Sequence, residues 1–150
     1  MTLQEARNFF ENLRNETSKK SQIKIYDKFI HILTELNTRE LSSEELQSIE
    51  NKLTSFDFTS KLNQGIKFFK KALADFETFL KENFSLILKG YYTNIGMGLG
   101  MSFGVLFGLV FLSGFERSMG ISLGICLGMF VGLLVGRNMD AKALAEGNVI

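Results

Sequence analysis

Glycine recurs at every fourth position in two stretches of this chain, and no other feature limits the possible folds as strongly. The first stretch reads GMGLGMSFGVLFG over residues 96–108, and the second reads GISLGICLGMFVGLLVG over residues 120–136. Inside a helix in water, each glycine costs roughly 1 kcal/mol relative to alanine. Some environment or packing arrangement must therefore offset that cost. The repeating glycines are Gly96, Gly100, Gly104, Gly108, Gly120, Gly124, Gly128, Gly132 and Gly136.

Both stretches lie in uncharged segments that are long enough to cross a lipid bilayer. Residues 95–115 and 118–136 carry no charged side chain, and only Glu116 and Arg117 stand between them. A spanning helix needs about 20 apolar residues to cross roughly 30 Å of hydrocarbon. A domain this small has no room to bury two such helices in succession. Because the connection SGFERSMG is short, the sequence predicts a transmembrane helical hairpin.

The membrane explains the glycines. In hydrocarbon no hydrophobic effect draws helices together, so close contact between backbones has to do so, and a line of glycines permits it. Each stretch is therefore a candidate glycine zipper. Two arrangements remain open: the lines pack against each other within one hairpin, or one or both join separate chains into a homo-oligomer. Beside the first line runs a ridge that faces lipid or fills a neighbouring hairpin's groove: Phe103, Phe107, Phe111 and Phe115.

The part of the chain before the spans carries most of the charge and reads as helices throughout. Thr2 with Glu5, and Ser42 with Glu45, are capping boxes, which mark helix starts. Together with stripes of apolar residues at helical spacing, they predict helices over residues 3–16, over about 22–36, and from about 43.

A longer amphipathic segment occupies about residues 65–90. Its apolar face includes Phe69, Phe76 and Ile87, and lysines supply the opposite face. Such a stripe indicates a fourth helix packed on the first three. A basic face opposite a phenylalanine-rich one also suits an interfacial helix lying on lipid headgroups.

The predicted fold class is accordingly all-α. A cytosolic helical domain of about four helices occupies residues 1–90, and a two-helix glycine-zipper hairpin occupies residues 91–137. Its spans cover about 95–115 and 118–136, and a short cytoplasmic tail covers 138–150.

Basic and aromatic residues flank the spans as interfacial anchors. Lys89, Tyr91 and Tyr92 precede the first span, where an aromatic belt is expected, and Arg137 follows the second. The turn contributes only Arg117. The excess of basic residues at the outer ends predicts that both termini are cytoplasmic. The N-terminus lacks the apolar core of a secretory signal, which agrees with a cytoplasmic N-terminus.

No constellation for catalysis is apparent. His31 and Cys126 are the only residues of their kinds, so the sequence indicates neither a metal site nor a disulfide framework. Uncharged spans argue against a proton relay. A net charge of +1 gives no field that would favour nucleic acid. We expect no catalytic residue, no cofactor, no metal and no enzymatic activity.

The segments GYYTNIGMGLGMSFGVLFG and ERSMGISLGICLGMFVGLLVGRNMD resemble those of bacterial inner-membrane proteins with a two-helix glycine-zipper hairpin. This resemblance implies a multi-pass protein of the inner (cytoplasmic) membrane. Glycine zippers also occur in mechanosensitive channels and pore-forming toxins. The leading hypothesis is a self-associating membrane scaffold or anchor whose partners are the lipid bilayer and other copies of itself. The alternatives are an oligomeric or holin-like pore, and a tethered adaptor whose cytosolic domain recruits a protein partner.

Overall fold

The chain is helical in every regular element of the computed structural model, which describes residues 1–111 and 117–150 without the side chains of Asn63, Phe111 and Arg117. The expected all-α fold is thereby confirmed. Contacts divide the chain into unit 1, Met1–Ser85 with Ile150, and unit 2, Leu86–Val149. Unit 1 holds α1 (Leu3–Glu16), α2 (Lys20–Thr38), α3 (Ser43–Phe56), the short 3₁₀ helix η1 (Leu62–Gln64) and α4 (Gly65–Phe84).

Local signals set the helix starts in unit 1. Both predicted capping boxes form, with the side chains of Thr2 and Ser42 each accepting a hydrogen bond from the backbone N–H of the glutamate three residues on. Those glutamates, Glu5 and Glu45, accept in return from the cap residues' N–H groups. Helix α2 extends two residues beyond the predicted range at each end. At its start, the N-cap Lys19 makes no side-chain cap bond that would mark the boundary.

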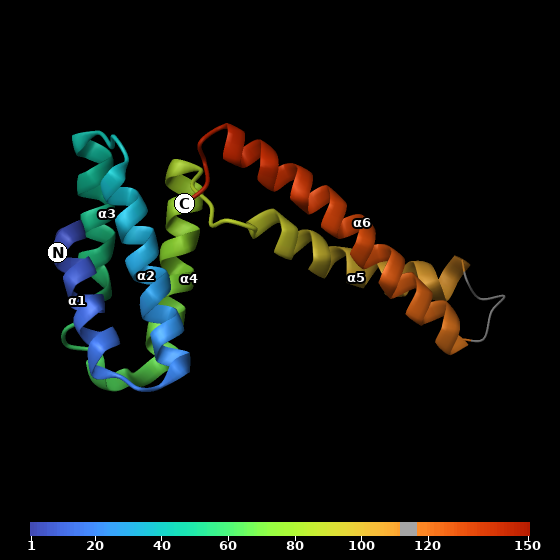
Figure 1. Ribbon diagram of the computed structural model, residues 1–150, viewed down its shortest axis with the longest axis horizontal. Coiled ribbons are helices and arrows are strands. Elements are labelled where there is room, and N and C mark those ends of the chain that lie inside the picture. The colour runs from blue at the N-terminus through green and yellow to red at the C-terminus, as the bar shows by residue number, and fades with distance from the viewer. Residues whose placement is uncertain (112–116) are drawn as a thin grey trace. The chain divides into compact units, whose positions relative to one another are not determined.

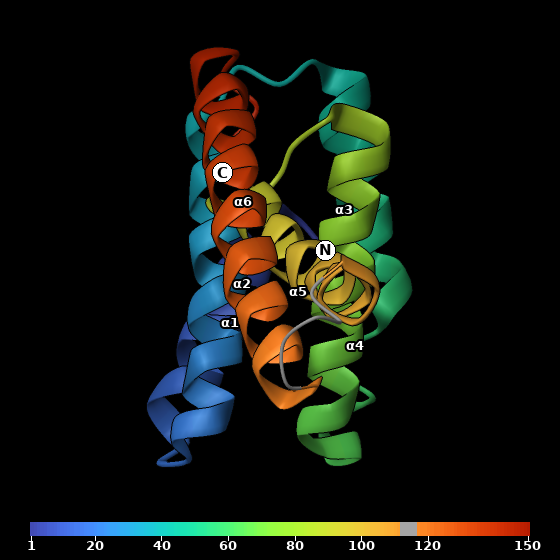
Figure 2. The ribbon, with the colours of Figure 1, turned by 90° about the vertical axis from the view of Figure 1, so that its right-hand side faces the viewer.

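A cluster of phenylalanines forms the core of unit 1, whose helices α1 to α4 are seen from two directions in Figures 1 and 2. The rings of Phe10 and Phe29 stack with centroids 4.2 Å apart, and α4 adds Phe69 and Phe76 to the cluster. The apolar face of α4 is therefore buried against protein. Phe58, which follows α3, is also fully buried. The residue before it, Asp57, takes the left-handed conformation that ends α3.

Helix α4 ends at Phe84, before the predicted residue 90. Ser85 adopts the left-handed conformation, and its N–H donates to the carbonyls of Leu80 and Lys81. The chain then extends, and the N–H of Ile87 donates to the carbonyl of Asn148 at 2.9 Å. Ile87 therefore belongs to a short pairing with the C-terminal segment rather than to the apolar face of α4.

Unit 2 is built on α5 (Tyr91–Phe111) and α6 (Arg117–Ala145), which lie against each other in Figure 1. Helix α5 starts four residues before the predicted span. Helix α6 runs well beyond Gly136, so much of the predicted tail is helical. It ends in a Schellman motif: Gly147 has a φ of 75°, and the N–H groups of Gly147 and Asn148 donate to the carbonyls of Leu144 and Ala143.

Candidate membrane hairpin

Helix α5 from Ile95 onward, and helix α6 between Ser118 and Gly136, carry no charged side chain and have apolar side chains on every face. Two segments, Tyr91–Val110 and Ser118–Ala145, are long and apolar enough to cross a membrane, and only 11% and 17% of their most apolar windows are buried. The core helix of a soluble protein would be mostly buried, whereas these helices expose large apolar side chains on several faces. Among them are Leu99, Met101, Phe103, Leu106, Leu109, Val110, Leu123, Leu127, Phe130, Val131, Leu134 and Val135. The two helices are therefore candidate membrane-spanning elements by length, composition and exposure.

The two glycine lines face each other within this hairpin. A Cβ atom built on Gly100 would fall well inside 3.0 Å of the carbonyl oxygen of Gly128, and one built on Gly128 would meet the carbonyl oxygen of Gly100 in the same way. The opposed pairs are Gly96 with Gly132, Gly100 with Gly128, Gly104 with Gly124, and Gly108 with Gly120. Because the residue numbers in each pair have the same sum, the register of two antiparallel helices is constant along the contact.

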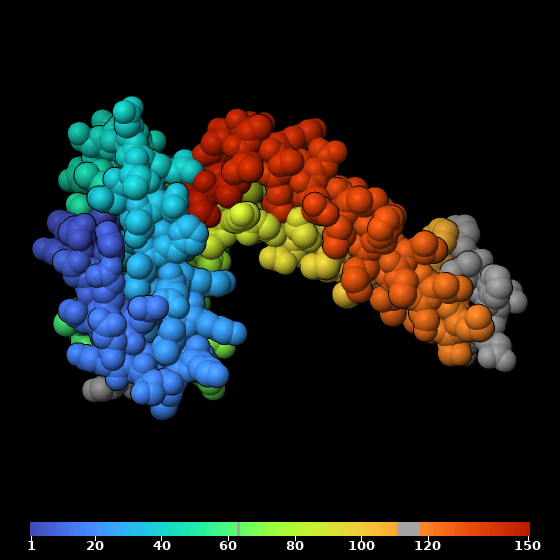
Figure 3. All heavy atoms as spheres, in the orientation of Figure 1, coloured from blue at the N-terminus to red at the C-terminus, as the bar shows by residue number. Residues whose placement is uncertain are grey.

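Backbone contact extends to the start of α5, before its first glycine, Gly96. A Cβ on Gly136 would lie 2.5 Å from the carbonyl oxygen of Tyr92 and 2.6 Å from the Cα of Thr93. Gly98, which lies outside the four-residue line, has nothing within 4 Å of such a Cβ. Among the glycines of α5 and α6 for which the structure describes these contacts, close approach to the other helix thus occurs at those of the four-residue repeat and not at Gly98. In Figure 3 the atoms of the two helices adjoin along the face shown.

The open end of the hairpin is the end opposite the turn, where α5 begins and α6 ends. There one carboxylate links the two helices. Asp140 of α6 accepts the backbone N–H of Tyr92 at 2.9 Å through Oδ1 and that of Thr93 at 3.0 Å through Oδ2. These N–H groups belong to the first turn of α5, where no intrahelical acceptor exists. The neighbouring N–H groups, of Tyr91 and Asn94, donate to the carbonyls of Leu88 and Gly90. The start of α5 is therefore fully capped, in part by the other helix.

Sequence reasoning missed Asp140. A signal was present, because Asp140 continues the period of the second line, four residues after Gly136. Asp140 therefore follows Gly136 on the face of α6 that meets the start of α5. A carboxylate in that position also interacts favourably with the positive end of the α5 dipole.

The predicted phenylalanine ridge lies beside the glycine contact. Phe103 is 68% exposed, and it lines with Phe107 an apolar groove of about 660 Å³ between the two helices. Leu99 from α5 and Leu127 and Val131 from α6 complete its walls. The remaining members of the ridge, the side chain of Phe111 and all of Phe115, lie outside the described residues, as does the side chain of the predicted anchor Arg117.

The other predicted anchors gather at the open end. The rings of Tyr91 and Tyr92 pack edge to face with centroids 5.3 Å apart. Lys89, just before α5, and Arg137, on α6, line one pocket of about 640 Å³. The structure thus brings four of the five predicted anchors to one end of unit 2.

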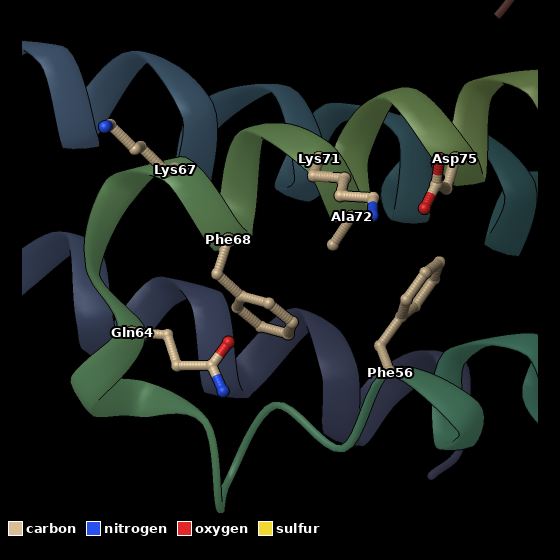
Figure 4. Close-up of a pocket in the computed structure, with 7 residues that line it drawn as sticks. All are labelled: Phe56, Gln64, Lys67, Phe68, Lys71, Ala72 and Asp75. Atoms are coloured by element: carbon tan, nitrogen blue, oxygen red, sulfur yellow. The ribbon is translucent and has the colours of Figure 1, made fainter.

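Unit 1 has a smaller pocket of about 450 Å³ beside the first half of α4 (Figure 4). The rings of Phe56 and Phe68 border it, and Lys71 and Asp75 line it from α4. His31, the lone histidine, is exposed on α2 with its Nδ1 3.9 Å from a carboxylate oxygen of Glu35. Within the described residues, no group of three or more His, Cys, Asp or Glu side chains is placed to hold a metal ion.

Comparison of the chain with protein-family models, with curated proteins and with solved structures gives no match.

Adding one methyl group at Gly128 is expected to destabilise the hairpin, whereas the same change at Gly98 is not. In Gly128→Ala the new Cβ would collide with the carbonyl of Gly100 and lie 2.8 Å from the Cα of Gly104. The backbones must move apart, at a cost of about 1–3 kcal/mol. In Gly98→Ala the methyl meets open space.

The measurement is the free energy of unfolding from an SDS titration of each full-length variant in mixed micelles. Unit 1 is identical in both, so the difference between the two alanine variants reports on the hairpin. Equal stability of Gly128→Ala and Gly98→Ala would show that the glycine contact does not stabilise the fold.

Removing the cross-helix cap should loosen the start of α5. Asp140→Ala leaves the N–H groups of Tyr92 and Thr93 without their acceptors, and loss of a cap costs about 1–2 kcal/mol. We expect these two amides to exchange hydrogen faster in micelles, as measured by NMR. Asn138→Ala, an exposed position on the same helix, is the control. Unchanged exchange in Asp140→Ala would contradict the role of the carboxylate.

Proposed function

We propose that the protein is an integral membrane anchor, in which the α5–α6 hairpin spans a bilayer and holds the helical unit 1 at the membrane surface. The observation that carries this proposal is the exposure of the two apolar helices, each long enough to cross. In water such a surface would cause aggregation, because large exposed apolar patches are a liability in soluble monomers. A bilayer removes that liability.

In this proposal the hairpin holds unit 1 at the membrane, where unit 1 meets a partner, and the spans carry out no chemistry. Unit 1 buries most of its large apolar side chains in its own core and exposes charged side chains on all four α-helices. A surface of this kind suits a protein partner in the cytosol. The pocket bordered by Phe56 and Phe68, with Lys67 and Lys71 on α4, is the position that we assign to such a partner.

The membrane that we propose is the bacterial inner membrane, with both termini in the cytoplasm. Lys89 and Arg137 lie at the open end of the hairpin, and Lys142 follows one turn later on α6. Loops that remain in the cytoplasm are enriched in such residues.

Topology is tested by cysteine labelling in the Cys126→Ser protein. With a membrane-impermeant maleimide, we expect Ser118→Cys to be labelled in intact bacterial cells, and Lys142→Cys only after the inner membrane is opened. Both variants should remain in the membrane pellet after an alkaline carbonate wash. Release into the supernatant would overturn the proposed anchor, and the reverse labelling pattern would overturn the orientation alone.

A second candidate function is that of a self-associating scaffold. The groove beside the glycine contact favours it, since Phe103 and Phe107 stand at its edge and it runs along both helices. In this candidate, large side chains from a second copy fill the groove. The glycines themselves are in contact within one chain, so the oligomer would use the face next to them.

If the protein is a scaffold, its molar mass in lipid nanodiscs should exceed that of one chain. The molar mass should be lower in Phe103→Ala. Met101→Ala is the matched control, because Met101 is also exposed but lies about 200° around the axis of α5 from Phe103. Light scattering gives the mass. A wild-type monomer, or equal loss of mass in both variants, would reject the scaffold and leave the simple anchor.

A further inference from the structure

The pocket at the open end of the hairpin has the composition of a phospholipid headgroup site. It has a volume of about 640 Å³, within the usual range for small-molecule sites. It lies between the start of α5 and the last turns of α6, where the apolar spans end. Its polar lining consists of Lys89, Thr93, Asn94, Arg137 and Asp140, and its apolar lining includes Leu133, Leu144 and Val149.

Two of these side chains bring positive charge that the protein does not use internally. Within residues 1–111 and 117–150, the ion pairs involve neither Lys89 nor Arg137. Both side chains are exposed at the pocket. Arg137 can form two parallel hydrogen bonds to a phosphate, and Lys89 adds a point charge.

The carboxylate in the pocket does not cancel this attraction. Each oxygen of Asp140 already accepts a backbone N–H, from Tyr92 at 2.9 Å and from Thr93 at 3.0 Å. The formal charge of the lining is two cations and one anion, which leaves +1. A phosphodiester carries a single negative charge and matches that remainder, whereas free phosphate and nucleotides carry more.

From this arrangement we infer that the pocket binds the phosphodiester of an anionic phospholipid. Lys89 and Arg137 contact the phosphate, and the side-chain amide of Asn94 offers a donor to the glycerol part of the headgroup. Leu133, one turn of α6 toward the span from Arg137, adjoins the first carbons of the acyl chains. The inference rests on the proposed membrane insertion and adds the class of lipid that the anchor selects.

Such a site would couple the hairpin to membrane composition. Juxtamembrane basic residues gain affinity from anionic lipids, by an amount that corresponds to roughly fivefold for each cation. Because Asp140 joins the helices in the same pocket, a bound phosphate would sit beside the cross-helix cap.

The test uses the full-length protein in micelles and native mass spectrometry, with phosphatidylglycerol and phosphatidylcholine as probes. Wild type should retain phosphatidylglycerol in preference to phosphatidylcholine. Lys89→Gln combined with Arg137→Gln should lose that preference, roughly fivefold for each cation removed. Lys142→Gln removes a nearby cation that does not line the pocket, so it should weaken the preference by less than Lys89→Gln or Arg137→Gln alone.

Three outcomes would overturn the inference: equal retention of the two lipids by wild type, an unchanged preference in the double variant, or loss of phosphatidylglycerol on adding inorganic phosphate, which would make free phosphate the ligand. A carbonate-washed membrane pellet keeps the proposed function separate. Protein that stays in the pellet but does not select phosphatidylglycerol contradicts this site alone, whereas protein found in the supernatant contradicts the anchor.

Discussion

Contact between two glycine backbones is the interaction on which the hairpin depends. At four successive levels the carbonyl of one helix occupies the space where a Cβ of the other would stand. In a bilayer, van der Waals contact of this kind is the available attraction, since lipid tails are as apolar as leucine. The large side chains are consequently left for the outer surface, which explains why Phe103, Leu127 and Phe130 are exposed.

The contacts at the open end of the hairpin keep the same register as the glycine pairs. At the open end the second line continues from Gly136 to Asp140, and the carboxylate replaces backbone contact with two hydrogen bonds to the start of α5. A polar group there stands where the apolar spans give way to Lys89 and Arg137. Backbone contact along the middle of the helices and hydrogen bonds at the open end thus hold the two helices together at different points along their length.

Sequence periodicity was sufficient for the helices and insufficient for several of their ends. The capping boxes at Thr2 and Ser42 and the two apolar spans predicted the main elements, because caps and apolar length are local signals. The stop of α4 at Ser85 was not predictable, since a serine in the left-handed conformation carries no distinctive pattern. The burial of Phe58 and the bond from Asp140 to Tyr92 depend on contacts between distant residues, which local patterns do not specify. Periodicity also left open whether the glycine lines meet within one chain or between chains.

Whether the glycine lines meet within one chain is the most direct test of this account of the hairpin. Solid-state NMR of the protein in lipid, with ¹³C at the Cα and carbonyl carbons of its 14 glycines, measures dipolar contacts between glycines of the two helices. The account predicts contacts between opposed glycines such as Gly100 and Gly128 that persist when labelled chains are diluted with unlabelled ones. Contacts that fade on dilution, or that never arise, would contradict it.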